Sequence, residues 1–308
     1  MTDLLVIANG RLGKGLAHAR WQRALYRLRE LFGNGVEIYF TKGRGDATRR
    51  AREALLAGVG WLAAAGGDGT FHEVVNGYFD RGRNIQPKSA LSFFPCGSAN
   101  DWTRTLGVPG SLLASVEALT SSTIHKVDVS LARYQGLSGA AEERVFINLA
   151  EAGIGAEVVR RWLSRFRILR SRTAYLLTAV SASLSYVPKR LQLVFDGQAA
   201  VATEPLLALI VAGGRYFGAG IHCAPMATVD DGLLEVITLG NFSTREIPRQ
   251  LSNFIRGEYF DHPKVTHRSA KSIEASAGEK VFLELDGELV GSLPFTISIL
   301  PQALWTRY

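Results

Sequence analysis

Residues 63–79, AAAGGDGTFHEVVNGYF, place three glycines and one carboxylate between a short apolar run and a segment of helical periodicity. This pattern predicts a buried strand, a tight turn, and a helix from near Thr70 to near residues 76–77. A glycine-rich turn at a helix N-terminus favours an anion, because free backbone N–H groups and the helix dipole face outward there. Asp68 would repel that anion unless a cation such as Mg²⁺ lay between them. The alternative is a structural turn with a solvated aspartate.

Composition narrows the class of protein. The chain has 308 residues, of which 47% are hydrophobic and 20% charged, so we expect two ordinary domains rather than disorder. The net charge of +7 favours an anionic partner, which could be nucleic acid, a nucleotide or an acidic membrane. Cys96 and Cys223 are far apart, which argues against disulfides and zinc and is typical of a reduced, cytoplasmic protein. The apolar runs are too short for a membrane span, so any membrane contact is expected to be peripheral.

Two periodicities divide the chain. Up to about residue 124, strand-like runs such as LLVIAN and VEIYFT alternate with helical segments, one of them with Asp46 as the expected N-cap. This predicts an α/β nucleotide-binding domain over 1–124, with a mainly parallel sheet and ligands at its carboxyl edge. From residue 125 to about 294, alternating runs such as KVDVSLARY and KVFLELDGELVG predict an antiparallel β-sandwich with a helical insertion at about 157–187. The tail, about 295–308, can pack back on the first domain.

Two common phosphate-binding motifs do not occur. The string G-x-x-x-x-G-K-[ST] is missing, and so is G-x-G-x-x-G. GGDGTFHEVVNG, followed by FFPCGSANDWTRTLGVP at 93–109, instead closely resembles the catalytic region of the diacylglycerol kinase family, particularly the soluble bacterial lipid kinases. Sphingosine and ceramide kinases are more distant relatives. The resemblance continues through VFINLAEAGIGAEV, APMATVDDGLLEVITLG and LELDGELVGSLPFTISILP. It implies a nucleotide domain related to those of NAD kinases and phosphofructokinases, followed by a β-sandwich.

The resemblance assigns a nucleotide site. It implies that ATP phosphates and Mg²⁺ are held by Asn9, Thr41, Gly66, Gly67, Asp68, Gly69, Thr70, Gly97, Ser98, Asn100 and Asp101. Asp68 and Asp101 would repel each other without a cation, so both are expected to bind Mg²⁺ through water. The chain departs from the family twice: it has NGRLGKG where Asn-Pro is usual, and His72 where bacterial relatives commonly have Asn. The histidines, His72 among them, show no metal-ligand spacing, and we interpret them as surface or packing residues.

The second domain supplies two further predicted sites. Asp230 and Asp231 resemble the acids of a structural Mg²⁺ site, with Asp231 the expected ligand beside main-chain oxygens near Thr228 and Leu233. A simple β-turn is the alternative there. Glu288 aligns with the general base of the family. Glu288 and Asp68 are therefore the expected catalytic residues. Taken without the resemblance, its Asp-Gly-Glu sequence would indicate a hairpin turn.

Residues 160–172, RRWLSRFRILRSR, interleave arginines with bulky apolar side chains. This predicts a basic amphipathic helix, which can lie on an anionic bilayer or pack on the sandwich as an ordinary surface helix. We expect membrane contact through Arg161, Trp162, Arg165, Phe166, Arg167 and Arg170.

The function expected from these features is an ATP-dependent lipid kinase that converts diacylglycerol to phosphatidate. The alternatives are a sphingosine- or ceramide-type lipid kinase, an NAD kinase, and a non-catalytic nucleotide or lipid sensor. We expect a cytoplasmic, peripherally membrane-associated protein whose partner is a lipid at a membrane surface. Only the net charge favours nucleic acid, so we expect no nucleic-acid partner. The sequence leaves open whether the protein forms a homodimer.

Overall fold

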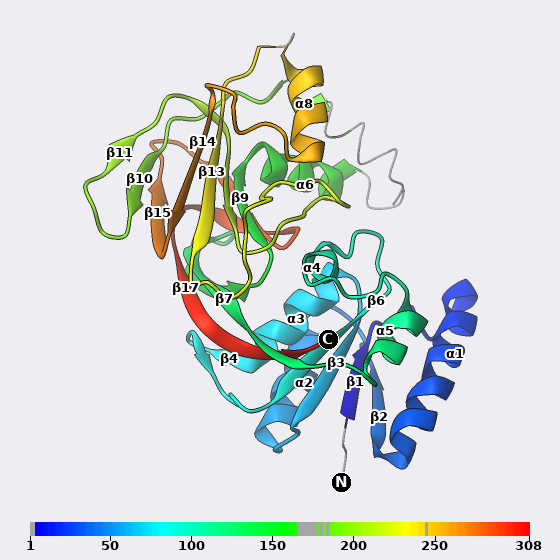
Figure 1. Ribbon diagram of the computed structural model, residues 1–308. Helices are drawn as coiled ribbons and strands as arrows, with labels where there is room; N and C mark the ends of the chain where they lie inside the picture. Colours follow the sequence, from blue (N-terminus) through cyan, green and yellow to red (C-terminus); the bar gives the residue numbers. More distant parts are fainter. Residues whose placement is uncertain (1–3, 166–177, 179–180, 183–184, 244–245) are drawn as a thin grey trace.

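The protein has two parts, an α/β unit and a β-sandwich, which share one long strand (Figure 1). The computed structural model describes residues 4–165, 178, 181–182, 185–243 and 246–308. This architecture confirms the fold expected from the two periodicities.

The α/β unit is built on a parallel sheet. Its strands are β1 (Leu4–Ala8), β2 (Val36–Phe40), β3 (Trp61–Gly66) and β6 (Ala90–Pro95), in the order β6-β3-β1-β2. Helices cover both faces: α1 (Gly15–Phe32), α2 (Asp46–Leu56), α3 (Asp68–Tyr78), the short α4 (Asp101–Thr105) and α5 (Leu112–Ala118). β3 and β6 are buried on both faces, which explains why their sequences read as continuous apolar runs.

Two details of this unit differ from expectation. Gly45, in the left-handed conformation, is the N-cap of α2, and Asp46 is the first helical residue. The Asp46 carboxylate accepts the backbone N–H of Lys42 at 2.8 Å. Helix α3 begins at Asp68, two residues earlier than the sequence suggested, so the carboxylate of the glycine turn belongs to the first turn of the helix.

The sandwich packs two antiparallel layers on one apolar core. One layer has the order β14-β13-β12-β9-β16-β17, and the other contains β10, β15, β17, β7 and β8. The bounds are β7 (Ile124–Gly136), β8 (Ala141–Phe146), β9 (Leu149–Gly153), β10 (Gln192–Phe195), β11 (Val201–Ala202), β12 (Leu206–Ala212), β13 (Leu234–Gly240), β14 (Val265–Ala270), β15 (Ser272–Ser276) and β16 (Phe282–Leu285). Helices α6 (Ile154–Arg165) and α8 (Ile247–Arg256) lie along one side of it, with α6 nearer the α/β unit, and most of the predicted insertion after α6 falls outside the described residues.

Strand β17 (Glu288–Arg307) ties the two parts together. Its first residues pair with β16, its middle pairs with β7 and β15, and Trp305 and Thr306 pair in parallel with β6. The end of the chain therefore belongs to the α/β sheet, while the start of the same strand lies in the sandwich, at the boundary between them (Figure 1).

Two buried acids face each other in the sandwich. Glu151 of β9 and Glu284 of β16 are register partners, and both are almost fully buried. The Glu151 carboxylate caps α6, because its oxygens accept the backbone N–H groups of Gly155 and Ala156 at 3.1 and 2.5 Å. One Glu284 oxygen has no hydrogen-bond partner. Burial, and then the nearby Asp286, raise the pKa of Glu284 to about 7.

We predict that Glu284→Gln makes the protein more resistant to alkaline pH. The folded-state pKa lies above the ordinary 4.5, so stabilisation from this group is complete at low pH and lost as pH rises through about 7. Gln cannot ionise. The melting temperature of the variant relative to wild type should therefore be higher at pH 8 than at pH 5, by roughly 2 °C or more. Glu274→Gln, at an exposed position of β15, is the control. An equal difference in melting temperature between Glu284→Gln and wild type at pH 5 and at pH 8 would contradict the prediction.

Candidate active site

The glycine turn is shaped by close backbone contacts. Gly67 is the N-cap of α3, and a Cβ placed on Gly97 would lie 2.5 Å from the Cα of Gly67. A Cβ on Gly66 would overlap the Thr70 side chain. Glycine is therefore required where the turn after β3 meets the turn after β6. The result is a close contact between two turns at the N-terminus of α3.

Four loops meet at the carboxyl edge of the parallel sheet, as the alternation of strands and helices predicts. Asn9, after β1, donates its amide to Thr70 Oγ1 at 3.2 Å, and the Gly10 N–H donates to Thr41 Oγ1 at 3.2 Å. The Gly97 N–H donates to Asn100 Oδ1 at 2.9 Å, and Ser98 is exposed in the same loop. The structure thus brings together the residues that the resemblance assigned to nucleotide binding.

Asp68 binds the turn after β6. Its carboxylate accepts the backbone N–H groups of Asn100 and Asp101 at 2.8 and 2.9 Å, and that of Trp102 at 3.4 Å. Burial, and then the Asp101 carboxylate, raise the pKa of Asp68 to about 6. Two acids therefore lie close together, as expected. A cation beside these two carboxylates would relieve their repulsion, so the pair of acids fits a metal. The Asp68 oxygens, however, already accept backbone N–H groups from the turn after β6.

Asp101 turns toward the sandwich. Its buried carboxylate accepts the backbone N–H groups of Ala219 and Gly220 at 3.0 and 2.8 Å, in the loop between β12 and β13. The neighbouring Thr105 hydroxyl accepts the Arg215 N–H at 3.0 Å. Asp101 was expected to face Mg²⁺; the structure instead gives its two oxygens to a contact between the two parts of the molecule.

Glu288 lines a cavity between the two parts. Its carboxylate accepts a hydrogen bond from Arg44 at 2.8 Å and forms an ion pair with Arg144 at 3.7 Å. A Cβ on Gly69 would lie 3.7 Å from Glu288 Oε1, so this acid is next to the glycine turn. The cavity has a volume of about 590 Å³. Its lining includes Arg44, Gly45, Thr48, His72, Glu73, Asn76, Arg144 and Glu288.

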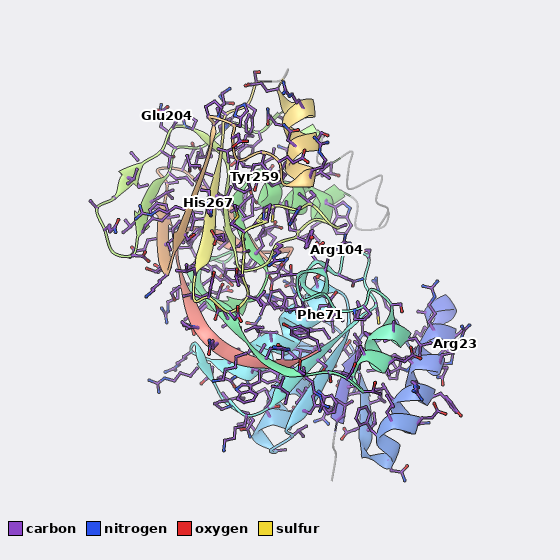
Figure 2. The ribbon with its side chains drawn as sticks, viewed as in Figure 1. Arg23, Phe71, Arg104, Glu204, Tyr259 and His267 are labelled. Carbon is purple, nitrogen blue, oxygen red and sulfur yellow. The ribbon has the colours of Figure 1, made fainter. Side chains whose placement is uncertain are left out.

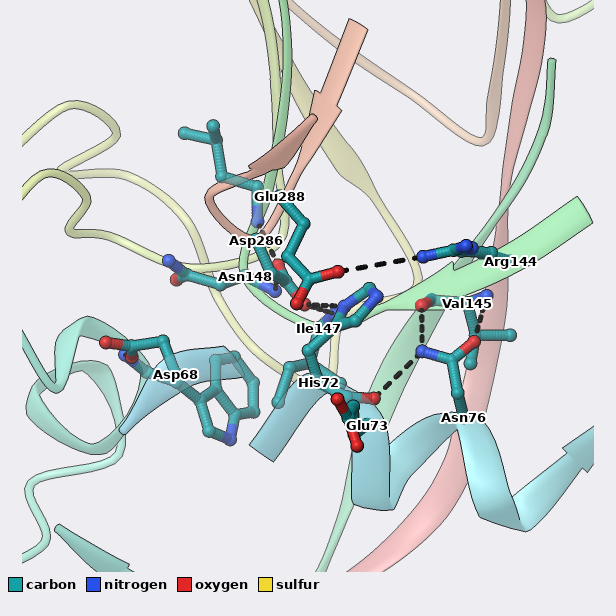
Figure 3. Close-up of polar contacts among 12 residues, drawn as sticks. Asp68, His72, Glu73, Asn76, Arg144, Val145, Ile147, Asn148, Asp286 and Glu288 are labelled. Carbon is teal, nitrogen blue, oxygen red and sulfur yellow. Dashed lines mark hydrogen bonds and ion pairs between the residues drawn. The ribbon is translucent and has the colours of Figure 1, made fainter. Parts of the chain in front are cut away.

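Three residues of this site were missed by sequence reasoning: His72, Asn76 and Asp286 (Figure 3). His72 Nδ1 lies 2.9 Å from Asp286 Oδ2, and both side chains are buried. The Asn76 side chain pairs with the backbone of Val145 in β8, donating at 2.9 Å and accepting at 3.1 Å. Asp68, His72 and Asn76 are spaced four residues apart, so they share one face of α3. This four-residue spacing is the sequence signal that could have identified His72 and Asn76 as partners of Asp68.

The acids near Asp231 form a second candidate site. Asp231 is exposed and accepts the backbone N–H of Leu233 at 3.0 Å, while Thr228 donates to Met226. Asp128, not selected from the sequence, is buried and accepts two backbone N–H groups. Burial, followed by Asp231 and Asp230, raises its pKa. Over the described residues, no group of three or more His, Cys, Asp or Glu side chains is arranged to hold a metal, so this Mg²⁺ site stays a prediction.

Only part of the predicted membrane-contact set can be placed. Arg161 is half-buried and donates to Glu157 at 2.6 Å and to Ser185 at 2.7 Å. Trp162 is half-buried too, and Leu163 is 45% exposed. Phe166, Arg167 and Arg170 lie outside the described residues, as does the side chain of Arg165. None of the described helices is long and apolar enough to cross a membrane.

We predict that Mg²⁺ raises the melting temperature of the wild-type protein and that Asp231→Ala removes this effect without altering ATP affinity. A cation would neutralise the acids at 128, 230 and 231, and it binds only the folded arrangement. Thermal melts with and without Mg²⁺ measure this, with the exposed Asp80→Ala as control. If Mg²⁺ leaves the melting temperature of wild type and of both variants unchanged, the turn at residues 230–231 binds no cation.

Two known domain families match most of this chain. Residues 3–132 match the diacylglycerol kinase catalytic domain, and residues 148–306 match the YegS C-terminal NAD kinase beta sandwich-like domain. A probable YegS-like lipid kinase of Chromohalobacter salexigens is 31% identical over 98% of this chain and 92% of its own length. A diacylglycerol kinase of Staphylococcus carnosus is 30% identical over 96% of this chain and 92% of its own length.

Solved structures agree with this. The crystal structure of a putative diacylglycerol kinase from Bacillus anthracis superposes with a TM-score of 0.78 at 25% identity, covering 100% of this chain and 97% of the other. Yeast NADH kinase, solved with NADH, shares the fold alone, with a TM-score of 0.52 at 10% identity over 99% and 82% of the two chains. By its two domains and its relatives over nearly the whole length, the chain belongs to the diacylglycerol kinase and YegS-like lipid kinase family.

Proposed function

We propose that this protein transfers the γ-phosphate of ATP to the hydroxyl of a membrane lipid, and that diacylglycerol is the acceptor. The observation that carries the proposal is the position of Glu288: an acid from the sandwich strand β17 lies against Gly69, in the glycine turn of the α/β unit. A phosphate on that turn would therefore face a carboxylate that can accept a proton. The relatives' names include diacylglycerol kinase, which favours this acceptor.

The shape of the site supports ATP as the donor. The glycines at 66, 67 and 97 let the turns after β3 and β6 approach each other closely, and the N-terminus of α3, an end of a helix that favours anions, begins at that contact. The 590 Å³ cavity beside it is large enough for a nucleoside. Mg²⁺, when bound with ATP, would neutralise phosphate charge beside Asp68 and Asp101. The four loops at the sheet edge hold the nucleotide in place; they do no bond chemistry themselves.

The proposed reaction is an in-line displacement. The lipid hydroxyl oxygen forms a bond to the γ-phosphorus, and the bond from the γ-phosphorus to the β–γ bridging oxygen breaks, releasing ADP. Glu288 accepts the hydroxyl proton. Phosphoryl transfer needs mostly alignment and neutralisation of charge. Arg44 and Arg144, which contact Glu288, orient this carboxylate and bring positive charge to the phosphate side of the cavity.

We predict that Glu288→Gln lowers lipid phosphorylation by about 10²–10⁴-fold, the usual contribution of a positioned base. Gln keeps the shape of the side chain but loses its basicity. ATP affinity should change by less than roughly threefold, because the base acts on the acceptor rather than on the nucleotide. The measurement pairs initial rates of lipid phosphorylation with nucleotide titration of the same variant.

The matched control is Glu143→Gln, an acid that lines the same cavity but pairs with Arg133 at 2.9 Å. It should keep most of the activity. A Glu288→Gln enzyme that phosphorylates lipid at nearly the wild-type rate would remove Glu288 from the mechanism. A collapse of ATP affinity would instead place this residue in the nucleotide site.

The acceptor is tested with a panel of lipids. Diacylglycerol, sphingosine and ceramide are compared in mixed micelles, with NAD as a non-lipid acceptor and labelled ATP as donor. The proposal expects the highest kcat/KM with diacylglycerol. Faster phosphorylation of NAD than of every lipid would support the NAD kinase alternative, and turnover of none of them would favour a sensor.

We also propose that the segment from α6 onward docks on an anionic membrane. Arginines at 161, 165, 167 and 170 alternate with apolar residues, and Leu163 is exposed at the end of α6. Each basic residue near such a surface contributes about 1 kcal/mol, screened by salt. Under this proposal the bilayer lies beside the sandwich.

We predict that replacing Arg165, Arg167 and Arg170 by Gln weakens binding to anionic vesicles by roughly a hundredfold, given about 1 kcal/mol for each charge. Activity on those vesicles should fall with binding, while activity in neutral detergent micelles persists. Vesicle sedimentation at low and high salt measures binding, and replacing Arg20, Arg23 and Arg29 of α1 controls for net charge. Equal losses in vesicles and micelles would mean that the segment is purely structural.

A further inference from the structure

We infer that His72 is a positioning residue that fixes Glu288 against the glycine turn, acting through Asp286. The inference rests on the proposed role of Glu288 as the base. His72 and Asp286 contact each other across the boundary between the α/β unit and the sandwich, 214 residues apart in the sequence (Figure 3). Neither side chain has a role in the reaction described above.

The Asp286 carboxylate is held on all sides. It accepts the backbone N–H groups of Ile147, Asn148 and Leu149 at 3.2, 3.0 and 3.0 Å, in the segment that leads into β9. His72 Nδ1 completes the set at 2.9 Å. The side chains of His72 and Asp286 are 2% and 3% exposed, so water does not compete for these bonds. Three bonds therefore fix Asp286 to the sandwich, and one fixes it to α3.

The turn transmits this constraint to Glu288. Asp286 and Gly287 have φ angles of +49° and +82° and join β16 to β17 in a tight hairpin. Glu288 follows at once, paired with Leu285 across that hairpin. Because the turn is so short, a displacement of Asp286 moves Glu288 with it. His72 comes from the same helix as Asp68 and Gly69, one helical turn later, so it links the phosphate turn to the base.

The ring chemistry identifies which part of His72 matters. A carboxylate oxygen accepts hydrogen bonds, so Nδ1 carries the proton that is shared with Asp286. The second ring nitrogen, Nε2, is buried and has no hydrogen-bond partner. Asn can present its amide N–H in nearly the position of Nδ1, whereas Leu fills much of the same volume without any donor. These two substitutions separate hydrogen bonding from packing.

The experiment compares His72→Leu, His72→Asn and Val75→Ala with the wild-type enzyme. Val75 is also buried on α3 but packs in the apolar core of the α/β unit, so it controls for loss of stability. His72→Leu is expected to lower kcat by about 10–100-fold, the effect of a small misplacement of a catalytic group, with KM for ATP within roughly threefold. His72→Asn should retain kcat within about threefold. Val75→Ala should lower the melting temperature without lowering kcat at 25 °C.

A second readout does not depend on turnover. Amide hydrogen exchange of the peptide carrying residues 286–290 should be faster in His72→Leu than in wild type, and near wild type in His72→Asn. Unchanged exchange and unchanged kcat in a folded His72→Leu protein would overturn the inference. So would equal losses of kcat in His72→Leu and His72→Asn, because the donor would then be irrelevant. If Glu288→Gln remains active while exchange responds as expected, the assignment of the base fails but His72 still anchors the turn.

Discussion

A carboxylate shielded from water must find hydrogen-bond donors, and the site depends on how three aspartates meet this requirement. Asp68 takes its donors from the start of α4, Asp101 from the loop at 219–220, and Asp286 from the segment before β9 and from His72. In each case the donors come from another segment. The loops around the cleft are therefore fixed to one another by groups that cannot be left unpaired without a large energetic cost.

Helix α3 is the element on which these contacts converge. Asp68, His72 and Asn76 lie along one face and bind, in turn, the turn after β6, the β16–β17 hairpin and strand β8 (Figure 3). Phe71 of the same helix lies within the α/β unit, where it is buried (Figure 2). From another part of the same helix, Glu73 accepts the backbone N–H groups of Gly45 and Ala47 at the start of α2. One helix thus sets the positions of the glycine turn, the cavity between the two parts and the proposed base. This arrangement meets the main requirement of phosphoryl transfer, which is alignment.

The sequence predicted what depends on local pattern. Periodicity identified both folds, and the glycines at 66–69 identified the turn, because close backbone approach leaves few other choices of residue. Partners that are distant in sequence could not be found in this way. Asp101 bonds to residues 118 and 119 positions later, and His72 to one 214 positions later, and nothing local encodes either direction. His72 therefore passed for a packing residue, and Asp101 was assigned to a metal, whereas in the structure both of its oxygens accept hydrogen bonds from the 219–220 loop.

The measurement that tests the central claim most directly is a crystal structure with a non-hydrolysable ATP analogue, Mg²⁺ and a short-chain diacylglycerol. The proposed mechanism predicts that the phosphates lie against residues 66–70 and 97–98. The lipid hydroxyl should lie between the γ-phosphate and Glu288, within hydrogen-bond distance of the carboxylate. Phosphates bound away from the glycine turn, or a lipid hydroxyl out of reach of Glu288, would contradict the claim that the two parts of the molecule form one kinase site.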